Sequence, residues 1–205
     1  MSFSIYQLKP RFQQLLRPLL AALTRAGITP NQVTLAAMAL SVVHGAALAW
    51  RPAATALWFG LPLFLLIRMA LNAIDGMLAT ATGNKTALGA LLNEMCDQVS
   101  DAALYLPFAL AIGVSAPLVV AVVVFALLAE FAGVLAQAIG APRRFDGPMG
   151  KSDRAFAFGV VALLIGFGTA PAWSNGVLAL VLLLSLVTVF NRLRQALRLC
   201  APATP

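Results

Sequence analysis

Six long apolar segments, separated by short polar ones, constrain this chain more than any other feature of its sequence. A helix needs about 20 apolar residues to cross a hydrocarbon core roughly 30 Å thick. Because that core offers the backbone no hydrogen-bond partners, apolar segments of this length cross it as helices. The chain of 205 residues is therefore expected to form an all-α, polytopic bundle of six transmembrane helices. The six segments are residues 32–50, 55–78, 87–112, 116–140, 154–171 and 175–192.

The composition supports a membrane protein and leaves no room for a separate soluble domain. Hydrophobic residues make up 61% of the chain and charged residues 10%, whereas soluble domains average about 45–50% and about 25%. The net charge of +7 comes from positive residues scattered between the apolar segments. Since these residues do not form one soluble basic face, nucleic acid is not an expected partner.

The beginning of the chain predicts an amphipathic helix ahead of the apolar segments. Leu8, Phe12 and Leu16 recur at helical spacing, with Lys9 and Arg17 between them. A basic amphipathic helix suits the surface of an anionic membrane. We therefore expect three regions: a juxtamembrane helix over residues 1–27, a six-helix transmembrane domain over 28–200, and a short tail over 201–205.

The positive charges predict the topology. When successive loops are assigned alternately to the two sides of the membrane, only Arg51 lies opposite the basic side. Short cytoplasmic loops carry the excess of Lys and Arg. We therefore expect a multi-pass protein of the plasma (inner) membrane with both termini in the cytoplasm. The basic side holds Lys9, Arg11, Arg17, Arg25, Lys85, Arg143, Arg144, Lys151, Arg154, Arg192, Arg194 and Arg198.

Acidic residues are concentrated at one place in this apolar chain. Four of the seven fall between residues 72 and 101: Asp75, Glu94, Asp97 and Asp101. Ionisable groups beside membrane-spanning segments are costly, so they are candidates for a functional site. The predicted topology places this cluster at the cytoplasmic boundary of the second and third segments.

Helical spacing brings the polar residues of the cluster onto common faces, because positions three or four apart lie together. Asn72 and Asp75 share the end of the second segment. One stripe of the third segment holds Gly89, Asn93, Asp97 and Asp101. Oxygen ligands on two helices, with space for a phosphate beside small residues, are typical of a magnesium site.

At these residues the chain resembles the CDP-alcohol phosphatidyltransferase family. The family signature is D-x-x-D-G-x-x-A-R, eight residues, and then G-x-x-x-D-x-x-x-D. The expected order of an amphipathic helix followed by six spans also resembles the arrangement in this family. The Pro30-Asn31-x-x-Thr34 segment before the first span is a further similarity. The spacing of the signature is matched by Asp75, Gly76, Ala79, Gly89 and Asp97.

The resemblance implies an enzyme of phospholipid biosynthesis that works in the membrane. An alcohol acceptor would attack the β-phosphorus of CDP-diacylglycerol or a similar CDP-linked lipid, and CMP would be released. The cofactor would be Mg²⁺ or Mn²⁺. The family also suggests a homodimer surrounded by membrane lipids.

The resemblance also implies roles for individual residues. Asp97 would be the general base that takes the proton from the acceptor hydroxyl. The metal ligands would be Asp75, Asp97, Asn72 and Asn93. The nucleotide pocket would be lined by Asn31, Thr34, Asp75, Gly76, Ala79 and Gly89.

Three positions depart from the signature. Asn72 and Asn93 stand where the family has Asp, and Thr80 stands where it has Arg. Four carboxylates hold two divalent metals in the family, although an Asn still offers a carbonyl oxygen. Glu94 and Asp101 are nearby acids that would compensate. The alternative is a weakened or inactive member that acts as a lipid- or nucleotide-binding membrane protein, and a small ion or proton transporter is a third hypothesis.

A second basic segment precedes the fifth apolar segment. Its cations bracket a glycine-containing turn, where guanidinium groups and backbone amides both donate to anions. We interpret it, together with Lys85, as a site for the acceptor phosphate or a lipid headgroup, and cations that only set the topology are an equal alternative. The residues are Arg143, Arg144, Lys151 and Arg154.

Two further residues have structural interpretations. Arg68, inside the second segment, is expected either to extend its charged end toward the interface or to pair with Glu130 in the fourth segment. His44, alone among small apolar residues, is expected to be a packing residue.

Overall fold

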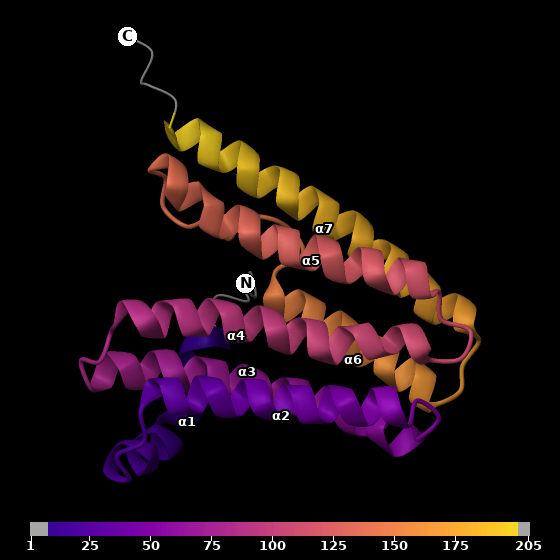
Figure 1. Ribbon diagram of the computed structural model, residues 1–205, viewed down its shortest axis with the longest axis horizontal. Coiled ribbons are helices and arrows are strands. Elements are labelled where there is room, and N and C mark those ends of the chain that lie inside the picture. Colours follow the sequence, from indigo (N-terminus) through magenta and orange to yellow (C-terminus); the bar gives the residue numbers. More distant parts are fainter. Residues whose placement is uncertain (1–7, 201–205) are drawn as a thin grey trace, which may run out of the picture. The chain divides into compact units, whose positions relative to one another are not determined.

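The chain is described by a computed structural model over residues 8–200, and every element of regular structure in that range is a helix (Figure 1). The predicted all-α class is confirmed. The first seven residues and the predicted tail over 201–205 lie outside the described range. The elements are α1 Leu8–Arg25, α2 Pro30–Trp50, α3 Thr55–Ala81, α4 Ala87–Tyr105, η2 Leu106–Leu110, α5 Ala116–Leu135, η3 Ala136–Ile139, α6 Lys151–Gly166 and α7 Pro171–Cys200.

Several of these helices have the length and composition of membrane spans. Within the described range, four segments are long and apolar enough to cross a bilayer: Pro30–Trp50, Thr55–Ala81, Ala116–Ile139 and Pro171–Cys200. The helices α4 and α6 have 19 and 16 residues and carry charged side chains. A multi-pass membrane protein is therefore established, and the count of six spans stays a prediction.

Proline explains one difference from the expected boundaries. The segment predicted as one span over 87–112 is α4 followed by the short 3₁₀-helix η2, which contains Pro107. Proline lacks an amide hydrogen and its ring clashes with the preceding turn, so it interrupts an α-helix.

The contacts within the chain define two compact units. Unit 1 consists of residues 8–43 and 66–101, and unit 2 of residues 44–65 and 102–200, in so far as the structure describes them. Unit 1 contains α1, most of α2 and α4, and the second part of α3. Unit 2 contains η2, α5, η3, α6 and α7 together with the remaining parts of α2, α3 and α4.

In unit 1, α1 packs through its apolar side. Leu16, Leu20 and Leu23 contact a buried cluster formed by Val33, Ile74 and Leu78. The spacing of three and four residues places the three leucines on one face of α1. The amphipathic pattern therefore fixes α1 against the beginning of α2 and the end of α3.

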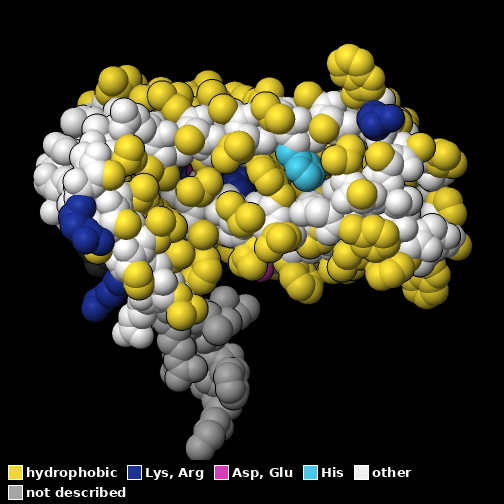
Figure 2. Space-filling model, turned by 90° about the horizontal axis from the view of Figure 1, so that it is seen from below, with side chains coloured by type: hydrophobic (Ala, Val, Ile, Leu, Met, Phe, Trp, Pro, Cys, Tyr) yellow, Lys and Arg dark blue, Asp and Glu magenta, His cyan; other side chains and the backbone are white. Residues whose placement is uncertain are grey.

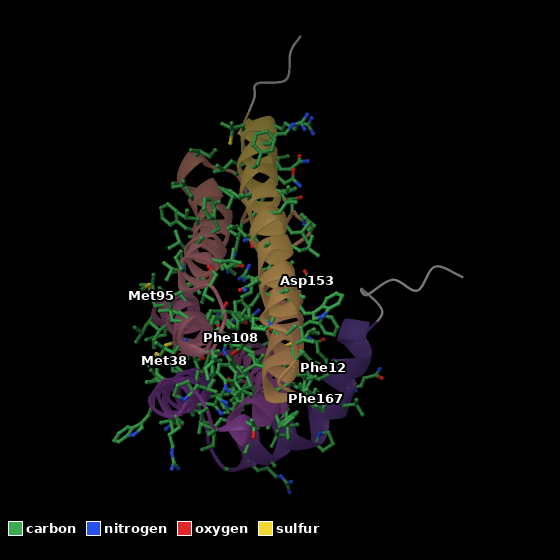
Figure 3. All side chains as sticks on the ribbon, turned by 90° about the vertical axis from the view of Figure 1, so that its right-hand side faces the viewer. Phe12, Met38, Met95, Phe108, Asp153 and Phe167 are labelled. Atoms are coloured by element: carbon green, nitrogen blue, oxygen red, sulfur yellow. The ribbon has the colours of Figure 1, made fainter. Side chains whose placement is uncertain are left out.

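In unit 2, α5 and α7 lie side by side, as Figures 1 and 3 both show. Phe108, labelled in Figure 3, packs edge-on against Trp58 and Phe158 with ring centroids 4.8 and 4.9 Å apart. Tyr105 stacks on the same Phe158 at 3.9 Å. His44 stacks on Phe64 at 4.7 Å, which agrees with its expected packing role.

The surface of the helices is apolar, as expected for contact with lipid. Large hydrophobic side chains such as Val43, Leu63 and Phe131 are more than half exposed. Figure 2 shows one face on which hydrophobic side chains dominate and few Lys or Arg side chains are visible. On a soluble protein an apolar surface of this extent would cause aggregation, whereas lipid covers it in a membrane.

Candidate active site

A polar pocket of ≈ 380 Å³ lies in unit 1. It is formed by the first turns of α2 and α4, the last turns of α3 and the loop between α3 and α4. Capping residues explain why the helices begin there. Thr29 and Gln32 exchange hydrogen bonds in a capping box at the start of α2, and the Thr86 hydroxyl accepts from the Gly89 amide at the start of α4. The pocket is lined by Pro30, Asn31, Thr34, Asn72, Asp75, Gly76, Ala79, Asn84, Lys85, Thr86, Gly89, Ala90 and Asn93.

The structure brings the predicted nucleotide residues together. All six line this pocket, although they come from three helices: Asn31, Thr34, Asp75, Gly76, Ala79 and Gly89. Of the four predicted metal ligands, Asn72, Asp75 and Asn93 also line it, whereas Asp97 does not and is hydrogen-bonded to the lining residue Asn72. Lys85 reaches the pocket from the loop and supplies a positive charge there.

Asp75 is held by a residue from a distant part of the sequence. Its Oδ2 accepts a hydrogen bond of 2.8 Å from the Thr34 hydroxyl, and both side chains are buried. This bond orients one carboxylate oxygen and joins α2 to α3. The sequence indicated both residues, and the structure supplies their direct contact.

Asp97 is held in a comparable way by Asn72. The Asn72 Nδ2 donates a hydrogen bond of 2.9 Å to Oδ1 of Asp97 and so joins α3 to α4. A carboxylate at position 72 has no hydrogen to donate and would repel Asp97 at this distance. The amide therefore makes a contact that two carboxylates make only through a cation or a shared proton.

Arg68 corrects one expectation. Its predicted partner was Glu130, but its Nη2 lies 2.7 Å from Oδ1 of Asp101. The same nitrogen donates to the backbone oxygen of Asp97 at 3.1 Å and lies 3.6 Å from that residue's Oδ1. Arg68 lies one helical turn before Asn72 on α3, so both residues reach α4 from one face.

The two acids proposed to compensate for the Asn residues are placed differently from the pocket residues. Asp101 is buried and paired with Arg68, and neither Glu94 nor Asp101 lines the pocket. Within residues 8–200, no three His, Cys, Asp or Glu side chains are close enough to hold a metal ion together. The oxygen donors of the predicted ligand set are therefore Asp75, Asn72 and Asn93 in the pocket lining and Asp97, which is bonded to Asn72.

The two glycines of the signature have different surroundings. A Cβ added to Gly89 would lie 3.1 Å from Asn31 Oδ1 and from Thr86 Oγ1, which is closer than ordinary packing. A Cβ on Gly76 would meet no atom within 4 Å. Gly89 is thus required for the close approach of α2 and α4, whereas Gly76 leaves open space beside the pocket.

The second basic segment lies in unit 2, between η3 and α6. Arg144 donates twice to Asp146, from Nε at 2.7 Å and from Nη2 at 2.8 Å. These hydrogen bonds lower the pKa of the Asp146 carboxyl, against the opposing effect of its partial burial. Arg143 lies over the ring of Phe145, 4.8 Å from its centroid, and burial lowers the pKa of Arg143.

A buried charge cluster lies beside this segment. Glu130 on α5 pairs with Arg154 at 2.8 Å and with Arg192 at 3.3 Å, and Arg143 lies 3.7 Å away. Sequence reasoning assigned Arg192 only to the topology and missed its contact with Glu130. The available signal was Glu130 itself, a single acid in the most apolar segment.

Known proteins resemble this chain over nearly its whole length. It is 44% identical to the inner membrane protein YnbA of Escherichia coli K12 over 97% of this chain and 98% of that protein. It is 32% identical to the phosphatidylinositol phosphate synthase of Mycolicibacterium smegmatis, with 88% of this chain and 83% of that enzyme covered. No family model matches the chain.

Solved structures show the same fold. The Mycobacterium tuberculosis phosphatidylinositol phosphate synthase with CDP-DAG bound superposes with a TM-score of 0.77 at 23% identity, over 94% of this chain and 99% of that one. The structure of that enzyme with manganese and citrate gives 0.76 at 22% identity over 92% of each chain. The predicted divalent cation agrees with the manganese of that structure.

Fold and pocket together define a multi-pass helical membrane protein with a polar, acid-containing site at the ends of three helices. With the similarity to the mycolicibacterial enzyme, the class becomes specific: the chain belongs to the CDP-alcohol phosphatidyltransferase family. The predicted family and the predicted class of enzyme, a membrane transferase of phospholipid synthesis, are confirmed. The inner-membrane location also agrees with the E. coli relative.

Proposed function

We propose that this chain transfers a phosphatidyl group from CDP-diacylglycerol, or a similar CDP-linked lipid, to the hydroxyl of an alcohol and releases CMP. The observation that carries this proposal is the convergence of all six expected nucleotide residues on one pocket in unit 1. The solved relative with CDP-DAG bound supports the choice of donor. The identity of the alcohol is a separate question.

The pocket suits the diphosphate of the donor. Helix N-termini favour anions because their first amide groups point outward and the helix dipole is positive there. The N-termini of α2 and α4 both border the pocket, and Lys85 adds a full positive charge. The cytidine would lie beside Gly76 and Ala79, where no bulky side chain fills the space.

The donor atoms around the pocket fit one divalent cation. Mg²⁺ and Mn²⁺ prefer oxygen ligands, and Asp75 and Asp97 supply two carboxylates whose summed charge balances one such ion. Asn72 and Asn93 add neutral oxygen or nitrogen atoms only. When bound, the cation would neutralise the charge that builds up on the diphosphate. Asp101 is left out of this set because it is 3% exposed and lies 2.7 Å from Arg68, whereas Asp97 is 19% exposed and lies 3.6 Å from the same nitrogen.

Asp97 is proposed as the general base. Its side chain is 19% exposed, and Asn72, which lines the pocket, fixes one of its oxygens. The carboxylate would take the proton of the acceptor hydroxyl as the new oxygen–phosphorus bond forms. The bond between that phosphorus and the CMP oxygen breaks, and CMP leaves with the electron pair. The role of Asn72 is to orient the base.

The membrane arrangement is proposed from the sequence pattern. We infer that α4 with η2, and α6, complete six spans, that α1 lies along the membrane surface, and that both termini are cytoplasmic. A homodimer is inferred from the family resemblance. The distribution of Lys and Arg between the loops supports this orientation.

The decisive experiment measures CMP release from CDP-diacylglycerol by purified protein in detergent or nanodiscs, with Mg²⁺ or Mn²⁺ and a panel of alcohols. The variants Asp75→Ala and Asp97→Asn should each lower the rate by about 100-fold or more. Glu94→Gln is the matched acid control, since Glu94 lies on the same helix as Asp97 but is turned about 100° from Asn93 by the helical period. Wild-type protein that binds neither CDP nor a divalent cation would contradict the proposal.

A second candidate function rests on the amides at positions 72 and 93. With two carboxylates fewer than the family signature, the pocket also suits a protein that binds a CDP-lipid without turning it over. This candidate predicts that CDP binds and that no alcohol in the panel yields CMP. Detectable turnover by the wild-type protein excludes this candidate.

A further inference from the structure

Glu130 is surrounded by arginines from three separate segments of unit 2. Arg154 of α6 donates from Nη2 to Oε1 at 2.8 Å, and Arg192 of α7 places Nη1 3.3 Å from Oε2. Arg143, from the loop before α6, lies 3.7 Å from the same Oε2. Both carboxylate oxygens therefore face guanidinium groups, and Glu130 is itself buried.

The two innermost arginines use their other donors on backbone carbonyl groups. Arg154, which is 0% exposed, donates from Nη1 to the oxygen of Met149 at 3.2 Å. Arg192 donates to the oxygen of Ala129 at 2.5 Å and to that of Asp146 at 3.3 Å. These contacts direct the guanidinium groups inward, onto Glu130 and the backbone.

The loop that presents Arg143 and Arg144 is held in place by the same part of the fold. The Arg144 amide donates to the oxygen of Gly133 at 3.0 Å, and the Met149 amide donates to the Thr188 hydroxyl at 2.9 Å. A Cβ on Gly147, whose φ is +124°, would lie 2.7 Å from Thr188. The loop is therefore seated closely on α5 and α7.

Three arginines expected to bind a phosphate in this segment thus have a carboxylate of the chain as partner. Arg143 and Arg154 face Glu130, and Arg144 is bound twice by Asp146. A phosphate at the same guanidinium groups would have to displace the Glu130 carboxylate or lie beside it. Displacement leaves a buried charge without a partner, and a position beside it brings like charges together in a medium of low dielectric constant.

We infer that the Glu130 carboxylate occupies the site formed by the guanidinium groups of Arg143, Arg154 and Arg192, and that this site therefore does not bind phosphate. This inference deepens the proposed function and rests on it and on the sequence-based assignment of this segment to the acceptor: if the chain transfers a phosphatidyl group to an acceptor bound at these arginines, that acceptor is an alcohol without a phosphate group. Glu130 is then a specificity-determining residue. The arginines serve to position it and to hold the loop on α5 and α7.

Binding of inorganic phosphate tests the inference without any need for turnover. We expect no saturable binding of phosphate to the wild-type protein by calorimetry. Glu130→Gln keeps the size of the side chain, removes the charge and should bind phosphate at least about tenfold more tightly. In this background, Arg143→Gln should reduce the gain, because Arg143 is the most exposed of the three arginines at 28%.

Matched acceptors test the consequence for the substrate. The CMP-release assay compares glycerol with glycerol 3-phosphate and inositol with inositol phosphate. We expect the wild-type protein to use an alcohol without phosphate in preference to its phosphorylated counterpart, and Glu130→Gln to shift this preference toward the phosphorylated one.

The possible outcomes separate the inference from the proposed function. Saturable phosphate binding by the wild-type protein, or its preference for a phosphorylated acceptor, overturns the inference and leaves the transferase intact. A folded Glu130→Gln variant that gains no phosphate binding also overturns it. If that variant does not fold, the wild-type phosphate titration decides. Absence of both CDP binding and CMP release across the panel of alcohols contradicts the proposed function. In that case the phosphate titration still tests whether Glu130 prevents phosphate binding.

Discussion

Asn72 donates a hydrogen bond of 2.9 Å to Asp97, and this contact replaces the carboxylate pair that the family signature has at these positions. The amide supplies a hydrogen where a carboxylate would supply a second negative charge. As a result, a direct hydrogen bond joins α3 to α4. The number of metal ions that the site binds should change with this residue.

The double variant Asn72→Asp, Asn93→Asp should raise the number of Mn²⁺ ions bound per chain from about one to about two, since it restores two carboxylates. Electron paramagnetic resonance of free Mn²⁺ during a titration measures the stoichiometry. Asn72→Leu is the control, because it removes the hydrogen bond without adding a charge. Two ions bound to the wild-type protein would refute the assignment of a single cation.

Removal of Arg68 should destabilise the protein strongly. Arg68 and Asp101 are 2% and 3% exposed and 2.7 Å apart, so Arg68→Met leaves a buried carboxylate without its cation. The expected cost is about 3–5 kcal/mol of unfolding free energy. The double variant Arg68→Met, Asp101→Leu should recover most of it. Unfolding in a denaturing detergent measures the free energy of unfolding of both variants. Equal losses in the single and double variants would show that the uncompensated charge of Asp101 is not the cause of the loss.

Gly89→Ala should disturb the pocket more than a substitution in open space. The added methyl group would lie 3.1 Å from Asn31 and Thr86, and overpacking of this kind costs about 1–3 kcal/mol. We expect weaker binding of CDP, measured by calorimetry, with the helical circular dichroism retained. Gly60→Ala is the control, since its new Cβ meets nothing within 4 Å.

Acidic pH should weaken the loop before α6. Hydrogen bonds from Arg144 lower the folded-state pKa of Asp146 below the ordinary value of about 3.9. A lowered carboxyl pKa contributes stability that is fully present above the ordinary value and is lost as the pH falls through the folded value. Thermal unfolding of the wild type and Asp146→Asn should therefore differ at neutral pH and converge below about pH 3.9. A difference that does not change with pH would contradict this assignment.

Much of the candidate site follows from local sequence. Asp75 and Asn72 share a face because they are three residues apart, and the fixed spacing between Asp75 and Gly89 reflects a short loop between two helices. Such short-range periodicity is reliable, because the helix imposes it on every residue. The nucleotide residues were expected from the family resemblance, and those on three different helices line one pocket in the structure.

The ends of the helices were less predictable, because hydropathy does not report where the hydrogen bonding of the helical backbone stops. The expected span over 87–112 is divided at the turn containing Pro107, and α7 extends to Cys200, beyond the apolar segment expected to end at residue 192. Polar residues extend a helix readily once its apolar part is packed, whereas proline stops it.

Long apolar segments and their flanking charges were enough to define a membrane protein and its class of fold, because each depends on neighbours in the chain, and the spaced signature indicated residues that line the pocket. The pairing of the buried charges depended on the tertiary structure. Arg68 pairs with Asp101 and Glu130 with Arg154 and Arg192, although the sequence suggested Arg68 with Glu130. Pairing of this kind is set by the rotation and relative depth of helices far apart in the sequence, and packing alone fixes these.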